Sequence, residues 1–267
     1  MDAPAAAIEF DNVFKRFGGG PTGTHELVAL AGISLTVPDR EFLVIVGPSG
    51  SGKTTLLRLI NRLSEPSEGA VRFSGTDVGT VDPIELRRRI GYVFQGIGLF
   101  PHMTVAENVA ITPRLLGWDR DKRAERADRL LELVRLPPAN YHNRFPHELS
   151  GGERQRVGVA RAIAAEPRVV LMDEPFGALD PLTRDAIGQD YRRLHNDLGL
   201  TTVMITHDTL EAVMLADRIA VLDKGRLIEE GTPHRLLTAP TTDYVRELMQ
   251  MPRTHAARLR ELMEDGR

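Results

Sequence analysis

Short apolar runs and longer amphipathic stretches alternate along most of the chain. Four short, largely apolar runs have the length of buried strands, and they lie at 42–46, 90–94, 169–173 and 201–206. Segments with helical spacing accompany these runs, at 53–62, 181–198 and 210–215. Strands that alternate with helices favour a mostly parallel sheet with helices on both faces. We therefore expect an α/β fold.

Hairpin patterns replace this alternation near both ends of the chain. Residues 8–17 alternate loosely between apolar and polar positions, and a glycine-rich turn separates them from a second strand pattern at 27–37. Residues 218–231 predict another hairpin with its turn at Lys224-Gly225, and a helical tail follows from Pro233. These patterns predict antiparallel strands at both ends of the parallel core.

The middle of the chain has a different texture. Residues 71–73 predict a short strand and residues 85–89 a short helix before the run at 90–94. Helical spacing then recurs at 104–118 and 122–134, prolines punctuate the region, and a last helix begins at Gly151. We interpret this region as a helical insertion between two core strands.

Composition and charge exclude several classes of function. The chain has 267 residues, is 42% hydrophobic and 27% charged, and carries a net charge of −3. No overall basic field favours a nucleic-acid partner, and the absence of cysteine excludes disulfides, zinc–thiolate sites and thiol catalysis. The first ten residues lack the basic start of a signal peptide, and no window approaches the roughly 18 apolar residues of a membrane span. Any membrane role is therefore expected to be peripheral.

The segment "GPSGSGKT" has the spacing of a phosphate-binding loop. It follows a predicted buried strand and opens a predicted helix, so a chance glycine loop is the weaker interpretation. Consecutive backbone N–H groups and the helix N-terminus would surround phosphates. The candidate residues are Gly47, Pro48, Ser49, Gly50, Ser51, Gly52, Lys53, Thr54 and Thr55. Lys53 would add positive charge at the terminal phosphates, and the Thr54 hydroxyl could bind Mg²⁺.

Polar residues also follow three predicted strands, at the edge where ligands of parallel sheets gather. In "VVLMDEP" four apolar residues precede Asp173 and Glu174; the aspartate could hold Mg²⁺ and the glutamate could polarise an attacking water. The alternative is a solvated acidic turn. His207 could contact a γ-phosphate, or could be a surface histidine like most others in the chain. Gln95 could join them, or be an ordinary loop amide.

The segment "LSGGERQR" predicts a second helix that begins at a phosphate-binding position. Ser150 is a natural N-cap, and Gly151 and Gly152 would let a ligand approach the backbone. Basic clusters at 87–89 and 119–129 could suggest contact with RNA or lipid, but the second alternates in sign as a solvated helix face does. One chain thus carries two separate helix N-termini that are suited to bind phosphate.

Taken in order, "GPSGSGKT", Gln95, "LSGGERQR", "VVLMDEP", "GALD" and His207 resemble the nucleotide-binding subunit of ATP-binding cassette (ABC) transporters over about residues 8–250. The resemblance implies a P-loop NTPase with a RecA-like core, an N-terminal antiparallel β subdomain and a helical subdomain at about 96–165. It assigns residues 1–240 to the nucleotide-binding domain and 241–267 to a helical tail. It also implies ATP and Mg²⁺ as cofactors, and no further domain in the short tail.

The family's motifs imply a role for each matching residue. Members resemble head-to-tail dimers in which ATP lies between the phosphate loop of one copy and the signature helix of the other. The implied roles are phosphate binding by Lys53 and the loop amides, Mg²⁺ binding by Thr54, Gln95 and Asp173, general base catalysis by Glu174, γ-phosphate sensing by His207, adenine stacking by Phe17, contact in trans by Ser150, Gly151, Gly152 and Glu153, and communication across the dimer by Asp180.

Further stretches indicate a branch of the family. "QGIGLFPHMTVAENVA", "LLGW", "FGALDPLTR" and "LGLTTVMITHD" resemble importers of glycine betaine, choline, carnitine and related osmoprotectants. This implies a peripheral ATPase on the cytoplasmic face of the membrane, with an identical or related ABC subunit, integral permease subunits and, indirectly, a solute-binding protein as partners. The helical subdomain and the segment after Gln95 would form the groove for a permease helix. An importer of an amino acid, polyamine or sulfonate is the alternative, and a soluble cassette protein of DNA repair or translation is a third hypothesis.

Overall fold

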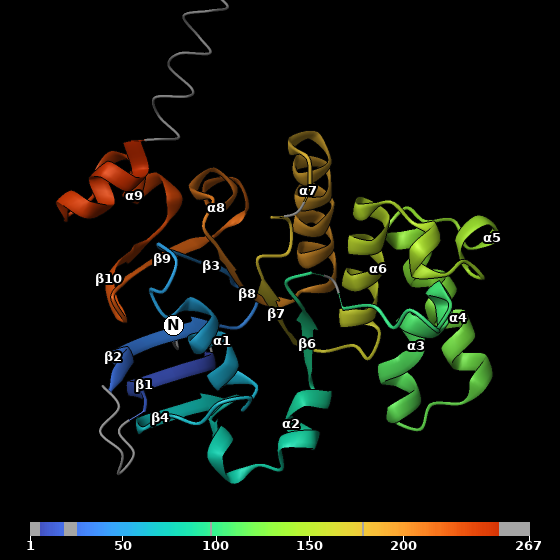
Figure 1. The fold of residues 1–267 in the computed structure, drawn as a ribbon, viewed down its shortest axis with the longest axis horizontal. Helices are drawn as coiled ribbons and strands as arrows, with labels where there is room; N and C mark the ends of the chain where they lie inside the picture. The colour runs from blue at the N-terminus through green and yellow to red at the C-terminus, as the bar shows by residue number, and fades with distance from the viewer. Residues whose placement is uncertain (1–5, 19–25, 97, 178, 251–267) are drawn as a thin grey trace, which may run out of the picture.

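The computed structural model describes residues 6–18, 26–96, 98–177 and 179–250, and its core is a six-stranded sheet (Figure 1). In spatial order the strands are β10 (Arg226–Gly231), β9 (Arg218–Asp223), β3 (Phe42–Val46), β8 (Thr201–Thr206), β7 (Val169–Asp173) and β6 (Ile90–Val93). All neighbouring pairs are parallel except β10–β9, which forms the hairpin predicted at 218–231. The predicted α/β fold with a mostly parallel sheet is confirmed.

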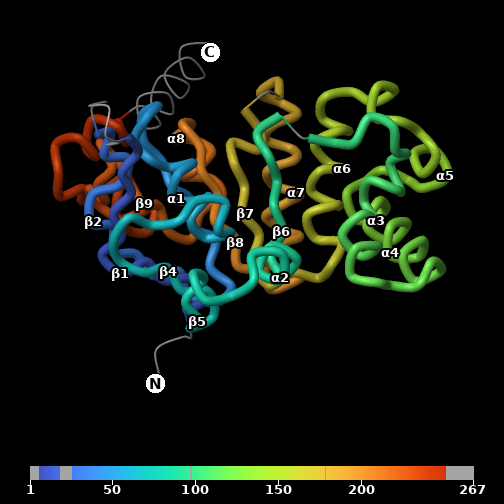
Figure 2. The backbone as a smooth tube through the Cα atoms, turned by 60° about the horizontal axis from the view of Figure 1, so that its bottom comes forward, coloured from blue at the N-terminus to red at the C-terminus, as the bar shows by residue number. Residues whose placement is uncertain are grey.

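A second sheet, which is antiparallel, contains the N-terminal strands. Its strands are β2 (Leu27–Pro38), β1 (Ala6–Phe17), β4 (Glu68–Phe73) and β5 (Thr76–Asp77). The pairing of β1 with β2 confirms the predicted N-terminal hairpin, although most of the glycine-rich turn lies outside the described residues. Figure 2 shows this sheet beside α1 (Lys53–Ile60), which also packs on the central sheet. The helix that follows the phosphate loop is therefore held between two sheets.

Strand β3 contributes to two hydrophobic cores because its alternate side chains point to opposite faces. Leu43 and Ile45 join the cluster that contains the buried residues of α1 and the antiparallel sheet. Phe42, Val44 and Val46 join the cluster that contains the helices on the other face. All five residues of β3 are buried, as a continuous apolar run in a parallel sheet predicts. This strand fixes the position of the loop that follows it.

The helices of the insertion lie together on the β6 side of the central sheet (Figure 1). They are α3 (Val105–Leu115), α4 (Arg120–Leu133), α5 (Pro138–Tyr141) and α6 (Gly151–Ile163), with the short 3₁₀ helix η2 (Pro146–Glu148) before α6. Helix α3 begins at a capping box in which Thr104 and Glu107 exchange side-chain and backbone hydrogen bonds. The predicted helices at 104–118, 122–134 and from Gly151 are confirmed, while α5 and η2 were not predicted.

The remaining helices cover the central sheet or connect its strands. They are α2 (Pro83–Arg88) after the 3₁₀ helix η1 (Val78–Thr80), α7 (Pro181–Leu198), α8 (Thr209–Leu215) and α9 (Pro233–Thr238). Residues 243–250 are also helical, and Val245 and Met249 are buried in the core. The rest of the predicted helical tail lies outside the described residues. Within the described ranges, no helix has both the length and the apolar character to cross a membrane.

Candidate functional site

The predicted phosphate loop joins β3 to α1 and bends sharply against the N-terminal sheet. Gly52, the N-cap of α1, has φ +102, and a Cβ atom there would lie 2.5 Å from the Ala29 carbonyl oxygen. Only glycine avoids both the backbone strain and this clash. Lys53 Nζ donates hydrogen bonds to the carbonyl oxygens of Gly47 (2.7 Å) and Pro48 (2.9 Å). The loop therefore curls around the lysine ammonium group.

The N-terminus of α1 has the features of an anion site. No side chain caps the helix, so the first-turn N–H groups remain available as donors. Lys53 adds a positive charge at the same end, although burial lowers its pKa and the nearby charges of Glu174 and Asp173 oppose that shift. Backbone donors and an ammonium group at one helix start are suited to bind phosphate groups.

Two carboxylates face this loop from the end of β7. Thr54 Oγ1 lies 3.5 Å from Asp173 Oδ1, which brings together two of the predicted Mg²⁺ ligands. Burial raises the pKa of Asp173, and the charge of Glu174 adds to that shift. Tyr92 of β6 and Thr54 lower the pKa of Asp173 and so oppose that shift. Oxygen ligands of this type, one carboxylate and one hydroxyl, fit Mg²⁺ when phosphate oxygens and water complete the coordination.

Glu174 is the point at which three of the predicted residues meet. Gln95 Nε2 donates to Glu174 Oε2 at 3.3 Å, and His207 Nδ1 lies 3.3 Å from the same oxygen. The three side chains follow β6, β7 and β8, which are neighbours in the sheet. Glu174 has φ +44, which is unusual for a residue with a side chain, while its N–H donates to the Ile205 carbonyl (3.0 Å). This backbone turn directs its carboxylate to the carboxyl edge of the sheet.

The signature segment lies at a second helix start, with its own side chains as caps. Ser150 Oγ accepts from Glu153 N (3.3 Å), and Glu153 Oε2 accepts from Ser150 N (2.7 Å). Tyr141 Oη donates to Glu153 Oε1 at 2.6 Å; this bond, with those from Ser150, lowers the pKa of Glu153. The Glu153 carboxylate thus serves its own helix in this structure. Figures 1 and 2 show α6 and α1 on opposite sides of β6, β7 and β8, so the two helix starts do not meet within one chain.

The two remaining predicted residues lie at the edges of these elements. Asp180 Oδ1 accepts from Thr183 N (3.0 Å) and caps α7. Phe17 ends β1 with 44% of its surface exposed, and Lys15 Nζ lies 4.8 Å from the centre of its ring. An exposed ring on the N-terminal sheet is available for stacking.

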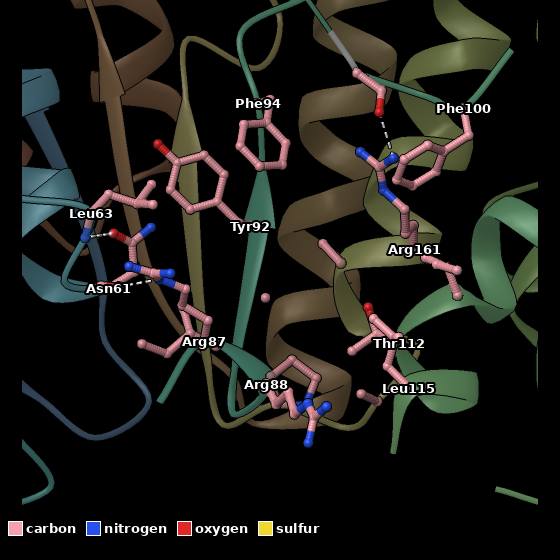
Figure 3. A pocket seen from close by; sticks show the side chains of 17 residues that line it. Asn61, Leu63, Arg87, Arg88, Tyr92, Phe94, Phe100, Thr112, Leu115 and Arg161 are labelled. Carbon is pink, nitrogen blue, oxygen red and sulfur yellow. Dashed lines mark hydrogen bonds between the residues drawn. The ribbon is translucent and has the colours of Figure 1, made fainter. Parts of the chain in front are cut away.

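A groove of about 510 Å³ lies away from the phosphate loop, between β6 and α2 on one side and α3 and α6 on the other (Figure 3). The large side chains Phe94, Phe100 and Leu115 contribute exposed apolar surface. Arg161 Nη1 donates to the Gly98 carbonyl at 2.7 Å, and Arg87 is held by the carbonyl oxygens of residues 61 and 62. The groove is therefore apolar in its body with arginines at its border.

Sequence reasoning missed three polar residues of these sites. Tyr92 affects the pKa of Asp173, Tyr141 donates to Glu153, and Arg184 Nη1 donates to Asp208 Oδ2 at 2.9 Å. Tyr141 and Arg184 lie on elements whose partners are distant in the sequence, so no local spacing links them. Tyr92 lies inside the predicted strand 90–94, two positions before Phe94. Its hydroxyl group, in an otherwise apolar run, was the feature of the sequence that could have indicated a polar role.

Comparison with known proteins identifies this combination of loop, carboxylates and signature helix. The sequence pattern of the ABC transporter family matches residues 30–177. The chain belongs to the ABC transporter family. The resemblance expected from its motifs is thereby confirmed.

Two curated relatives of this ABC family member span most of its length. The glycine betaine/carnitine/choline transport ATP-binding protein OpuCA of Bacillus subtilis is 48% identical over 242 residues, covering 91% of this chain and 62% of the relative. The glycine betaine uptake system ATP-binding protein YehX of Escherichia coli is 47% identical over 90% of this chain and 75% of its own length. The chain therefore spans less than two thirds of the length of OpuCA.

A solved structure supports the nucleotide-binding assignment of the fold. The cassette MJ0796, determined as a dimer in a post-hydrolysis state with ADP and Pi, has a TM-score of 0.74 and is 35% identical to this chain. The match covers 85% of this chain and 98% of that one. This likeness confirms the predicted P-loop NTPase fold.

Proposed function

We propose that this chain is the ATP-hydrolysing, energy-coupling subunit of an ABC importer for quaternary-amine osmoprotectants such as glycine betaine, choline or carnitine. The observation that carries the ATPase assignment is the convergence of Gln95 and His207 on Glu174, next to an uncapped phosphate-binding helix start. The similarity to OpuCA and YehX supports the solute class. An importer of another solute uses the same cassette chemistry and is the alternative.

Each residue has a defined task in the proposed reaction. The amides of loop 47–52 and Lys53 bind the phosphates, and Phe17 stacks on the adenine ring. Glu174 acts as general base toward the attacking water. Gln95 and His207 contact the Glu174 carboxylate and hold it in orientation, while His207 also senses the γ-phosphate. Thr54, Asp173 and Gln95 would hold Mg²⁺, which would neutralise charge that develops on the phosphates.

We further propose that hydrolysis takes place in a head-to-tail dimer. In Figure 1 the strands β8, β7 and β6 lie between the phosphate loop, which follows β3, and the signature helix α6. A second copy in the opposite orientation would place its Ser150, Gly151, Gly152 and Glu153 against the terminal phosphates, with Asp180 beside the boundary. The MJ0796 cassette was solved as a dimer, which supports a dimeric state.

The groove beside β6 is the proposed contact with the membrane partner. Its apolar body and arginine border suit a short amphipathic helix from an integral permease subunit. The chain would then lie peripherally on the cytoplasmic face of the membrane, and a solute-binding protein would act on it only through the permease.

Reconstitution tests the proposed solute class directly. The chain is assembled with its permease subunits in vesicles, and ATPase activity is measured while binding protein loaded with glycine betaine, choline or an unrelated amino acid is added. Stimulation by the quaternary amines alone supports the proposal. Stimulation by the amino acid alone would support the alternative importer, and no ATPase activity under any condition would contradict the assignment as an energy-coupling ATPase.

A further inference from the structure

Arg184, in the first turn of α7, connects two loops that the proposed reaction uses. Its Nη1 donates to Asp208 Oδ2 at 2.9 Å, and its Nη2 donates to the Leu179 carbonyl oxygen at 3.2 Å. The Arg184 side chain is only partly exposed, at 27%. A planar fork of donors can hold two acceptors in a fixed geometry, which a lysine ammonium on a flexible stem does poorly.

Asp208 holds the loop that carries His207. Its Oδ1 accepts from Leu210 N (2.9 Å) and Glu211 N (3.2 Å) and caps α8, while its own N–H donates to Thr206 Oγ1 (3.1 Å). The second carboxylate oxygen is the one that Arg184 contacts. His207 therefore lies between a strand end and a helix cap, and Arg184 ties that cap to α7.

The other contact of Arg184 lies next to the surface that would face a partner chain. Leu179 precedes Asp180, which caps α7. The same turn of α7 packs against the signature helix, because a Cβ atom at Gly152 would lie 2.8 Å from Thr183 Cγ2. Movement of this turn would therefore be transmitted to both the signature helix start and the His207 loop.

We propose that Arg184 is a positioning residue for ATP hydrolysis, which links the position of His207 to residues 179–180 at the dimer-facing end of α7. This inference rests on the proposed function. Among the described residues, the hydrogen bonds of Arg184 go to Asp208 and to the Leu179 carbonyl oxygen, so it acts through Asp208. When the partner chain displaces or orders residues 179–180, the link moves the His207 loop toward the geometry that supports hydrolysis.

Removal of either member of the link should lower the rate of hydrolysis without weakening nucleotide binding. We expect Arg184→Met to lower kcat by about tenfold, because displacement of a positioned group costs on the order of ten- to a hundredfold. The dissociation constant for ATP, measured with a fluorescent nucleotide on the single chain, should change by less than about twofold, since the phosphate loop is untouched. Arg184→Lys should recover part of the rate.

Asp208→Asn provides a second variant, which is expected to fold normally. Asparagine is as good an N-cap as aspartate, so α8 keeps its cap and loses only the charge that Arg184 binds. If the two residues act through one contact, the double variant should be no slower than the slower single variant. Fully multiplicative losses would overturn the proposal.

Arg192→Met is the matched control on the same helix. Arg192 has the same side-chain exposure, 27%, and pairs with Asp217, away from both loops. The Arg192→Met variant should unfold at a temperature similar to that of Arg184→Met, and it should keep the wild-type kcat. If the wild-type chain is active but the Arg184 and Arg192 variants have equal kcat values, the proposal for Arg184 is overturned and the proposed ATPase function is not. If the wild-type chain is no faster than Glu174→Gln, the proposed ATPase function itself fails.

Discussion

Helices α1 and α6 both begin at glycine-rich segments, but the N–H groups of their first turns are capped differently. At α1 the N-cap is Gly52, and no side chain caps the helix. At α6 the N-cap is Ser150, which forms a complete capping box with Glu153, and Tyr141 adds a further hydrogen bond. The first helix start keeps its backbone N–H donors free for a ligand. The second already uses part of its donors in hydrogen bonds to its own side chains.

This difference explains how the work can be divided between two chains. An uncapped helix start with Lys53 beside it can bind phosphate alone. A capped helix start has fewer donors to offer and would contribute only when a phosphate already bound elsewhere approaches its glycines. We therefore expect α1 to determine the affinity for ATP, and α6 to determine whether the bound ATP is hydrolysed.

Replacement of the proposed base should separate binding from hydrolysis most completely. We expect Glu174→Gln to lower kcat by about 10²–10³, since a positioned general base contributes roughly that factor. ATP should still bind at α1 and hold α6 of a second copy, so the variant should form an ATP-dependent dimer in analytical ultracentrifugation. Hydrolysis at the wild-type rate would contradict the role of Glu174.

Removal of the charge at α1 should weaken the binding of ATP to this helix start. Lys53→Met is expected to weaken ATP binding by roughly a hundredfold, because a hydrogen bond to a charged group contributes about 1.5–3 kcal/mol. Titration calorimetry of the single chain measures this. Unchanged affinity would show that α1 is not the main phosphate site.

Removal of the cap at α6 should lower the rate of hydrolysis and leave the affinity for ATP unchanged. We expect Ser150→Ala to leave the ATP affinity of the single chain unchanged, to lower kcat by about tenfold, and to lower the free energy of unfolding by about 1 kcal/mol, the usual effect of a lost N-cap. Thr104→Ala removes the equivalent capping box at α3 and should have the same effect on stability without the effect on kcat. Equal losses of kcat in both variants would assign the Ser150 effect to folding.

The smallest expected effect concerns Tyr141, which supports the capped helix start. Tyr141→Phe removes the hydrogen bond that is the largest cause of the lowered pKa of Glu153. Because the folded-state pKa of this acid lies below its unfolded value, the stabilisation is present at neutral pH and is lost as the pH falls through the folded-state pKa. The variant should be less stable than wild type by about 1 kcal/mol at pH 7, and the difference should shrink in acid. A pH-independent difference in urea unfolding would contradict this cause.

The sequence predicted the core strands, the phosphate loop and both helix starts because each has a local signal. Apolar runs such as 42–46 are buried on both faces, and Ser150 is followed three residues later by Glu153 as a capping box requires. Prediction was weaker where contacts with residues distant in the sequence determine the bounds of an element. Strand β4 begins at Glu68 rather than near residue 71, because Glu68 pairs with Phe14 of β1.

The candidate site shows the same limit. Gln95, Glu174 and His207 could be grouped because all three follow parallel strands, and such strand ends lie at one edge of a sheet. Arg184 could not be grouped with them, since its contact with Asp208 spans 24 residues between α7 and the start of α8. Tertiary packing, which no local pattern encodes, brings such pairs together.

The most direct test of the two-chain site is a cross-link between the two helix starts. The chain has no cysteine, so Ser49→Cys and Ser150→Cys each introduce a single thiol into the Glu174→Gln background. The two variants, distinguished by size, are mixed with Mg²⁺ and ATP and treated with a short bismaleimide. We expect an ATP-dependent product that joins one Ser49→Cys chain to one Ser150→Cys chain, and little product from either variant alone. Cross-linking that is equal in ADP, or that mainly joins two copies of the same variant, would contradict it.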